Sequence, residues 1–235
     1  MAGAVRVNGQ VITKAGSRVP AGEPLAVAED SPYVSRAGEK LAGALDDFGV
    51  DPSGRDCLDA GASTGGFTDV LLQRGSRRVI SVDVGYGQLD WKLREDPRVT
   101  VLERTNVRRL SVRDLPFEPD LLVADLSFIS LRVALQGLLS DTASISEAVL
   151  LVKPQFEAGP EQVGRGGLVR DPVVHVAVIR SVAESFDSLG FGALGVARAA
   201  VAGRKSGNQE YPLWLVRGAD MQLDEAGIRE VVEDG

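Results

Sequence analysis

Short apolar segments alternate with helical patterns along most of the chain, and this alternation limits the possible fold more than any other feature. Regular alternation of strands and helices is typical of a doubly wound α/β domain with a mostly parallel sheet. In such a domain the ligand site lies at the carboxyl ends of the strands. The last two apolar runs are expected to pair antiparallel. The predicted strands cover residues 57–60, 78–84, 99–103, 120–126, 147–153, 192–202 and 211–218.

Helices are predicted between these strands from residue spacing and from end signals. Leu41, Leu45 and Phe48 recur at helical spacing. Gly49 follows them as a typical stop, so a helix is expected over 35–49. Further helices are expected at 65–75, around residue 91 and at 171–189, where an Asp-Pro pair starts the longest one.

The N-terminal residues differ from the rest of the chain. Residues 1–30 alternate around an Asn8-Gly9 pair, which is a strong hairpin signal, and one more short strand is expected to end at Val27. Thirty residues are too few to build a core alone. The predicted organisation is an N-terminal segment at 1–30, a linker at 31–35, a main domain at 36–218 and an acidic tail at 219–235 that forms a solvated helix.

One cysteine and one histidine restrict the chemistry of the chain. A single cysteine cannot form an internal disulfide, and no cysteine–histidine cluster is present to hold zinc, so no metal is expected. Cys57 is expected in a buried strand and His175 on a helix surface. No apolar run approaches the ~18 residues of a membrane-spanning helix, and no secretory signal is evident. A cytoplasmic, soluble protein without a membrane partner is therefore expected.

The charge balance does not decide whether the partner is a nucleic acid. The net charge is −7, but six acidic residues and one arginine from residue 218 onward account for −5 and leave −2 for the other 217 residues. Residues 1–22 carry three basic residues and no acidic one, and arginines also cluster at 104–113. A weakly charged domain can therefore still present local basic surface to phosphates.

A glycine-rich turn after the first strand of the main domain predicts a nucleoside site. Gly61 and Gly65 allow a tight turn and a close ligand, but neither the dinucleotide fingerprint nor a P-loop is present. Asp59 precedes the glycines, where an acid favours a cationic group over a phosphate. Asp83 ends the second strand, where an acid accepts hydrogen bonds from ribose. S-adenosylmethionine fits this pattern; the alternative is a plain tight turn with Asp83 as a helix cap.

Four charged residues are predicted around the same edge of the sheet. Asp125 and Lys153 end two strands, while Glu210 precedes the last strand and Lys40 lies on the helix before the sheet. A hydroxyl group is too weakly acidic to react unaided. A lysine that is partly buried near a second ammonium accepts a proton more readily, and the two acids would orient the lysines. The alternative is an ordinary salt-bridge network at the rim.

Segments around these residues resemble the TlyA family, whose members resemble the FtsJ type of ribose 2′-O-methyltransferase. The resemblance implies a Rossmann-like domain that uses S-adenosylmethionine to methylate a ribose 2′-hydroxyl of ribosomal RNA, with cytidine as the expected nucleotide and ribosomal RNA or a ribosomal subunit as the partner. The similar segments occur in order between about residues 33 and 217: YVSRAGEKL, CLDAGASTGGFTDVLL, DVGYGQLDWKLREDPRV, LERTN, VADLSFISL, LVKPQFE and SGNQEYPLWL.

The resemblance also assigns roles to individual residues. The family's Lys-Asp-Lys-Glu tetrad falls on the four charged residues named above. Lys153 is then the expected base, Asp125 orients it, and Lys40 and Glu210 align the pair. Thr105 is expected near the adenine. The full expected cofactor-binding set is Asp59, Gly61, Ala62, Ser63, Thr64, Gly65, Asp83, Thr105, Asn106 and Asp125.

Family members carry an N-terminal RNA-binding domain of the ribosomal-protein type, with two helices before a β-hairpin element. Residues 1–30 resemble only the end of that domain. Either the start of the chain is truncated, or the protein binds RNA in another way.

Other functions stay open on sequence alone. An O-methyltransferase of small molecules would share the cofactor loop, and a ribosome-associated factor without catalysis would share the partner. A pore-forming protein, suggested by the haemolysin label that this family sometimes carries, is disfavoured because no signal, spanning segment or basic amphipathic helix is evident. An NAD oxidoreductase is disfavoured by the missing dinucleotide fingerprint.

Overall fold

The computed structural model describes residues 5–7, 10–12, 17–20, 22–23, 25–27, 31–200 and 207–233. The chain divides into two compact units, Met1–Tyr33 and Val34–Gly235. The boundary lies within the predicted linker, where the sequence changes from the N-terminal strands to the first helical pattern.

The N-terminal unit contains a three-stranded antiparallel sheet in the order β2-β1-β3. Val7 pairs with Gln10, which is the register that a two-residue hairpin turn requires. The predicted Asn8-Gly9 turn itself lies outside the described residues. That this unit belongs to an RNA-binding domain stays a prediction. The strands are β1 (Val5–Val7), β2 (Gln10–Ile12) and β3 (Leu25–Val27).

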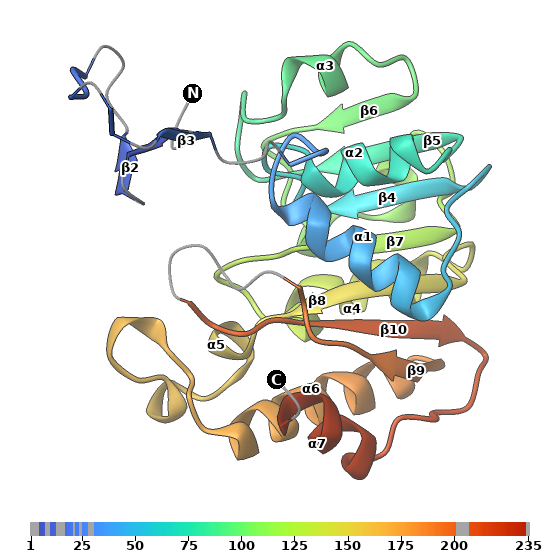
Figure 1. Ribbon diagram of the computed structural model, residues 1–235. Helices are drawn as coiled ribbons and strands as arrows, with labels where there is room; N and C mark the ends of the chain where they lie inside the picture. Colours follow the sequence, from blue (N-terminus) through green and yellow to red (C-terminus); the bar gives the residue numbers. More distant parts are fainter. Residues whose placement is uncertain are drawn as a thin grey trace. The chain divides into compact units, whose positions relative to one another are not determined.

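The main unit is built on a seven-stranded sheet in the order β6-β5-β4-β7-β8-β10-β9 (Figure 1). Strand β10 pairs antiparallel with β8 and β9, and the other pairs are parallel, so the predicted doubly wound fold is confirmed. The strands are β4 (Asp56–Ala60), β5 (Arg78–Val82), β6 (Val99–Leu102), β7 (Leu121–Ala124), β8 (Glu147–Val152), β9 (Phe191–Val196) and β10 (Tyr211–Arg217).

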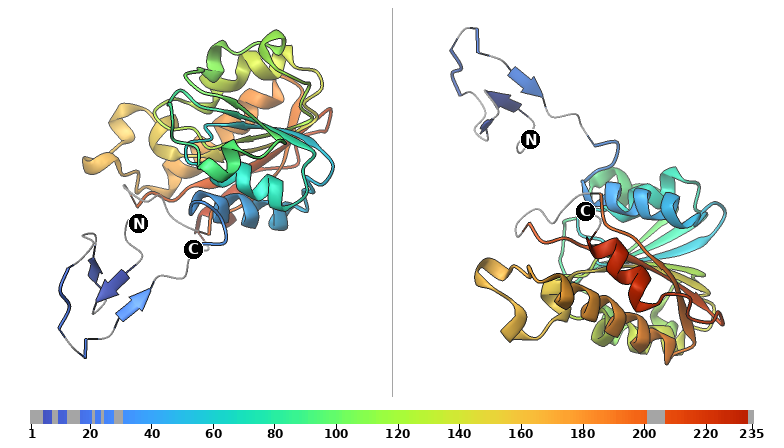
Figure 2. Two further views of the ribbon diagram at one scale, coloured as in Figure 1. Left: turned by 90° about the horizontal axis from the view of Figure 1, so that it is seen from above. Right: turned by 60° about the horizontal axis from the view of Figure 1, so that its bottom comes forward.

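Helices cover both faces of this sheet. Helices α1 and α2 lie on one face, and α4 and α6 lie on the other (Figure 2). Gly49 ends α1 in the left-handed conformation, with φ of 68°, as its position after the apolar pattern predicts. The helices are α1 (Ala37–Phe48), α2 (Gly66–Gln73), α3 (Trp91–Arg94), α4 (Leu131–Asp141), α5 (Pro154–Glu157), α6 (Pro172–Asp187) and α7 (Glu225–Glu233), with short 3₁₀ turns at 107–109, 112–114, 160–162 and 165–167.

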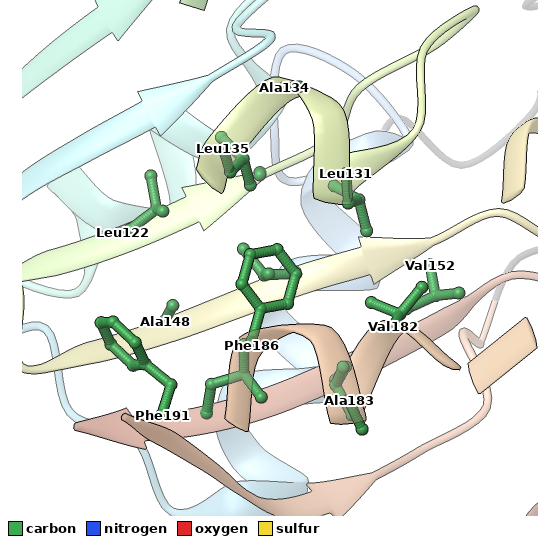
Figure 3. Close-up of a cluster of buried hydrophobic side chains, with 14 of the residues drawn as sticks. Leu122, Leu131, Ala134, Leu135, Ala148, Val152, Val182, Ala183, Phe186 and Phe191 are labelled. Carbon is green, nitrogen blue, oxygen red and sulfur yellow. The ribbon is translucent and has the colours of Figure 1, made fainter. Parts of the chain in front are cut away.

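The largest apolar cluster lies between the sheet and helices α4 and α6 (Figure 3). Phe186 of α6 and Phe191 of β9 are fully buried there beside Leu135 of α4. Apolar residues from the predicted strands and from the long helix thus meet in this cluster. This core holds the carboxyl ends of β7 and β8 in fixed positions.

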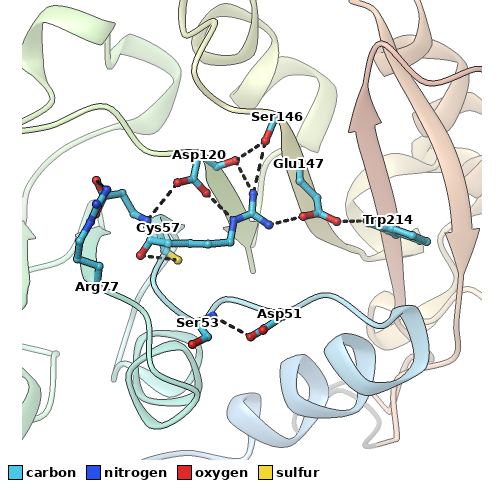
Figure 4. A network of polar contacts seen from close by, with 10 residues as sticks. Asp51, Ser53, Cys57, Arg77, Asp120, Ser146, Glu147 and Trp214 are labelled. Carbon is cyan, nitrogen blue, oxygen red and sulfur yellow. Dashed lines mark hydrogen bonds and ion pairs between the residues drawn. The ribbon is translucent and has the colours of Figure 1, made fainter.

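A polar network ties the strands together at the opposite, amino-terminal edge of the sheet (Figure 4). The Arg55 guanidinium forms ion pairs with Asp120 at 2.5 Å and with Glu147. The Trp214 indole N–H donates to Glu147 at 2.7 Å. One arginine therefore links residues that start β4, β7 and β8, and Glu147 extends the link to β10.

His175 is buried, although it was expected on the surface of the long helix. Its Nε2 lies 2.9 Å from the Val169 carbonyl oxygen and its Nδ1 lies 2.8 Å from the Tyr211 hydroxyl. Because a carbonyl oxygen only accepts, Nε2 carries the hydrogen, and in the neutral ring Nδ1 accepts from Tyr211. The expectation was wrong because Tyr211, 36 residues away, and the nearby Val169 carbonyl satisfy both ring nitrogens in the core.

The acidic tail forms a helix, but the helix is not merely solvated. In α7 the side chains of Ile228 and Val232 are buried, and α7 packs on α6. Glu225 also forms an ion pair with Arg180 of α6 at 2.9 Å. The high acidic content hid an amphipathic pattern, in which residues four apart form the buried stripe. Cys57, in contrast, is buried in β4 as expected, and burial raises the pKa of its thiol to about 12.

We predict that Phe186→Ala lowers the free energy of unfolding by about 3–5 kcal/mol, because it removes a large buried side chain and leaves a cavity. Val173→Ala is the control on the same helix: Val173 is 66% exposed, and its loss should change stability by less than about 0.5 kcal/mol. Denaturant unfolding followed by circular dichroism measures both. Equal losses in the two variants would contradict the assignment of the core.

Candidate active site

The predicted site residues gather at the carboxyl edge of the main sheet. The sheet order reverses between β4 and β7, and ligands bind at such a switch point in doubly wound folds. A pocket of about 150 Å³ lies there. It is lined by Ser35, Ala37, Gly61, Ala62, Ser63, Thr64, Gly66, Phe67, Asp125, Ser127 and Lys153.

The turn after β4 depends on the small size of its first residue. Gly61 has φ of 88°, and a Cβ built on it would lie 2.5 Å from the Asp125 carbonyl oxygen. Its N–H donates to the Val82 carbonyl at 2.8 Å. Gly65 also has a positive φ and lies against Leu93, so both glycines have steric roles within the protein. The close approach at Gly61 brings the predicted cofactor turn directly against the end of β7.

Asp59 is the second-last residue of β4 and is fully buried. Its Oδ2 accepts a hydrogen bond from the Thr68 hydroxyl at 2.7 Å, whereas its Oδ1 has no hydrogen-bond partner among the described residues. Burial raises the pKa of this carboxyl to about 7. A buried acceptor without a partner is costly, so this oxygen marks a position where a ligand donor would be stabilised.

Asp83 holds the turns that follow β4 and β5. Its Oδ2 accepts from the Ser63 N–H at 2.8 Å, and its Oδ1 accepts from the Gly85 N–H at 2.6 Å. Ser63 has φ of 50°, a backbone conformation that residues other than glycine rarely adopt. Asp83 is half-buried, and each carboxylate oxygen has a second lone pair for a further donor. It can therefore fix the turn and accept from a ribose hydroxyl as well.

Thr105 and Asn106 lie after β6 at the same edge of the sheet. The Thr105 N–H donates to the Asp83 carbonyl at 2.9 Å, so the two loops are joined. The Asn106 side chain is exposed and accepts from the Arg108 N–H at 3.0 Å as the cap of a 3₁₀ turn. Neither residue lines the pocket, and their expected place near the adenine stays a prediction.

Asp125 and Lys153 form an ion pair in the pocket. The Lys153 ammonium lies 2.5 Å from Asp125 Oδ1 and donates to the Ser127 hydroxyl at 3.0 Å. The lysine is largely buried, although it ends an apolar strand. Parallel pairing of β7 with β8 places the two strand ends side by side, which explains why residues 28 positions apart meet.

Lys40 of α1 and Glu210 form a second, buried ion pair. Glu210 comes directly before β10, and Tyr211 pairs with Val152, so the backbone at Glu210 lies beside that at Lys153. The structure thus pairs the four predicted residues as two ion pairs on neighbouring strand ends. Only the Asp125–Lys153 pair lines the pocket.

Several site residues were not predicted from the sequence. Ser35 lines the pocket, and its hydroxyl oxygen is buried without a hydrogen-bond partner in the described part of the chain. Phe128 is 91% exposed with φ of 66°, three residues after Asp125, and its ring lies 5.2 Å from that of Phe156. A lone serine or phenylalanine gives no signal in a sequence; the extreme exposure and backbone strain of Phe128 appear only in the structure.

The described residues include no group of three or more His, Cys, Asp or Glu side chains that could hold a metal ion. Within the same residues, no helix has the length and apolar character needed to cross a membrane.

Comparison with known proteins gives relatives along nearly the whole chain. The 16S/23S rRNA (cytidine-2′-O)-methyltransferase TlyA of Mycobacterium tuberculosis is 48% identical over 98% of this chain and 87% of that protein. The putative rRNA methyltransferase YqxC of Bacillus subtilis is 42% identical over 100% and 85%, respectively. A solved structure of a putative hemolysin from Streptococcus thermophilus is 39% identical, with a TM-score of 0.85 over 99% of this chain and 86% of that one.

The family described as FtsJ-like methyltransferase matches residues 33–217, which include every residue of the predicted site. Together with the identity to the relatives above, this match shows that the chain belongs to the FtsJ-like methyltransferase family.

Proposed function

We propose that this protein transfers a methyl group from S-adenosylmethionine to a ribose 2′-hydroxyl of ribosomal RNA, with cytidine as the target nucleotide. The observation that carries the proposal is the Asp125–Lys153 ion pair, 2.5 Å long, in the same pocket as the glycine turn. The Lys153 amine, which can accept a proton once it is unprotonated, therefore adjoins the expected cofactor site. The names of the relatives supply the class of RNA.

The residues around the pocket fit S-adenosylmethionine. The unpartnered Oδ1 of Asp59 suits the amino group, and the spare acceptor capacity of Asp83 suits ribose hydroxyls. The Ser35 hydroxyl, also without a partner in the described chain, is a further polar contact. When bound, the cofactor supplies an electrophilic methyl group on a sulfonium.

The chain's own residues would act on the attacking hydroxyl. Lys153 Nζ, in its unprotonated form, would hold the hydroxyl oxygen and take its proton as the oxygen–methyl bond forms and the methyl–sulfur bond breaks, which leaves the cofactor sulfur as a neutral thioether. Asp125 and Ser127 keep the lysine in position, and the Asp125 carboxylate stabilises the ammonium that results. Lys40 and Glu210 neutralise each other and support the neighbouring strand end.

An RNA substrate is supported by the surface near the pocket. Phe128 presents an almost fully exposed ring, and unpaired RNA bases stack on such rings. Exposed arginines follow the carboxyl end of β6 at the same edge, where they can contact phosphates. They are Arg104, Arg108 and Arg109.

We predict that Lys153→Ala lowers the rate of methyl transfer to ribosomal RNA by about 10²–10⁴-fold, the usual contribution of a general base. The matched control is Lys92→Ala, since Lys92 is an exposed lysine on α3. Incorporation of labelled methyl groups into isolated ribosomal subunits measures the rates, and calorimetry checks that cofactor affinity is kept. An unchanged rate in Lys153→Ala would remove the proposed base. Methylation of soluble hydroxyl compounds but not of RNA would favour a small-molecule enzyme.

We also predict that cofactor affinity weakens as the pH falls below about 7. The pKa of Asp59 is raised to about 7 by burial, so below this pH the carboxyl becomes neutral and loses its attraction for the cationic amino group. The loss should approach tenfold per pH unit. Calorimetry between pH 5.5 and 7.5 measures it.

Two variants serve as controls for this pH dependence. Asp59→Asn should bind weakly with little dependence on pH. Asp56→Asn, at the opposite end of β4, removes the partner of Arg77 and Arg78 but should keep the dependence. If Asp59→Asn showed the same pH dependence as the wild type, Asp59 would not be the titrating group.

A further inference from the structure

We propose that Glu157 is a positioning residue that fixes the loop carrying Asp125 and Ser127 relative to Lys153. This inference rests on the proposed methyl transfer and assigns a role to a buried carboxylate that the transfer itself does not use. Glu157 does not line the pocket, so it acts through the residues that do.

Glu157 ends the short helix α5, four residues after Lys153, and is 9% exposed. Its Oε1 accepts from the Leu131 N–H at 2.6 Å, and its Oε2 accepts from the Ser130 hydroxyl at 2.6 Å. Leu131 is the first residue of α4. The carboxylate thus caps a helix that begins 26 residues earlier in the chain.

Glu157 caps α4 because the residue at the N-cap position, Ser130, makes no side-chain hydrogen bond to the helix backbone. Ser130 occupies the N-cap position of α4, but its hydroxyl donates to Glu157 rather than accepting from the helix. A negative charge at a helix N-terminus is favourable, and charge-assisted hydrogen bonds are short and strong. Arg132 adds a contact from its Nε to Glu157 Oε2 at 3.4 Å.

These contacts join the two chain segments that carry the site residues at both of their ends. Residues 125–130 run from the end of β7 to α4, and residues 153–157 run from the end of β8 through α5. Strand pairing joins the two segments at one end, and Glu157 joins them at the other. The Asp125–Lys153 ion pair lies between these two connections. Without Glu157, the loop would keep its strand pairing and its contacts with Lys153, but the start of α4 would lose the two hydrogen bonds that tie it to α5.

The burial of Glu157 supports a role beyond stability. Burial raises the pKa of this carboxyl, which means that its charged form is disfavoured relative to water. Burying a charge is expensive even when it is hydrogen-bonded. The free-energy cost of burying the Glu157 carboxylate is explained if this residue keeps the loop of Asp125 and Ser127 in position relative to Lys153.

Three substitutions at this position distinguish the effect of side-chain length from the effect of charge. Glu157→Gln keeps the length of the side chain and can still accept from Leu131. Glu157→Asp keeps the charge but is one methylene shorter, and Glu157→Ala removes both. A positioning role predicts that kcat in Glu157→Gln stays within about threefold of the wild type, whereas kcat in the other two falls by about 10–100-fold, the cost of a displacement near 1 Å. KM for RNA and Kd for the cofactor should stay within about twofold.

Glu147→Ala is the matched control. Glu147 begins the strand that Lys153 follows, and it is also a partly buried carboxylate with an arginine partner, at the opposite edge of the sheet. Its loss should lower the melting temperature and leave kcat unchanged. Hydrogen exchange by mass spectrometry gives a second readout that needs no catalysis. Peptides covering 126–131 should exchange faster in Glu157→Ala than in Glu147→Ala.

The outcomes separate this inference from the proposed function. If the wild type transfers no methyl group to RNA, the proposed function fails, and the exchange of 126–131 alone decides whether Glu157 holds the loop. Equal kcat in Glu157→Ala and Glu147→Ala, or unchanged exchange, would overturn the positioning role. Should Glu157→Ala not fold, the Gln and Asp variants decide: an Asp variant more active than the Gln variant would show that charge, rather than reach, is what matters.

Discussion

The turn after β4 can lie against the end of β7 only because residue 61 has no side chain. A Cβ on Gly61 would lie 2.5 Å from the Asp125 carbonyl oxygen, far inside van der Waals contact. The Asp125 N–H donates to the Ala60 carbonyl at 3.0 Å, which continues the strand pairing to the same point. This contact places the proposed cofactor turn and the Asp125–Lys153 pair in a single pocket. The rest of the proposed chemistry depends on that adjacency.

The two edges of the main sheet have different roles: one stabilises the fold, and the other holds the proposed site. At the amino-terminal edge, Arg55 joins Asp120 and Glu147 in a network that holds strand starts together. At the carboxyl edge, Asp125 and Lys153 line a pocket. The Ser35 hydroxyl and Asp59 Oδ1 lie at the same edge and have no hydrogen-bond partner in the described residues. Unpartnered polar groups lower stability, and they are found where a ligand completes the bonding. The proposed cofactor would supply donors and acceptors for these two oxygen atoms.

Much of this architecture follows from local sequence patterns. Apolar runs predicted the strands of the main sheet and the antiparallel last pair, and Gly49 predicted the end of α1. Strand ends also brought Asp125 close to Lys153, because carboxyl ends of neighbouring parallel strands meet at one edge. These features could be predicted because they need only periodicity and the rules of α/β topology.

The features that sequence reasoning missed depend on contacts between distant segments. His175 is buried because Tyr211, 36 residues later, supplies its hydroxyl. Glu157 caps a helix that starts 26 residues before it. Neither the residue type nor its position in the sequence indicates this contact. The burial of α7 on α6 likewise requires a partner surface that a local charge count ignores. Contacts with distant segments decide whether a polar residue is solvated or buried, and local sequence patterns carry no information about these contacts.

The proposed acceptor of the methyl group is a ribose hydroxyl of ribosomal RNA. Mass spectrometry of nucleosides from ribosomal RNA, after incubation of subunits with the protein and isotopically labelled S-adenosylmethionine, tests this claim most directly. We expect labelled 2′-O-methylcytidine that is absent when the protein is omitted. Label on a nucleobase, or no label in RNA despite bound cofactor, would contradict it.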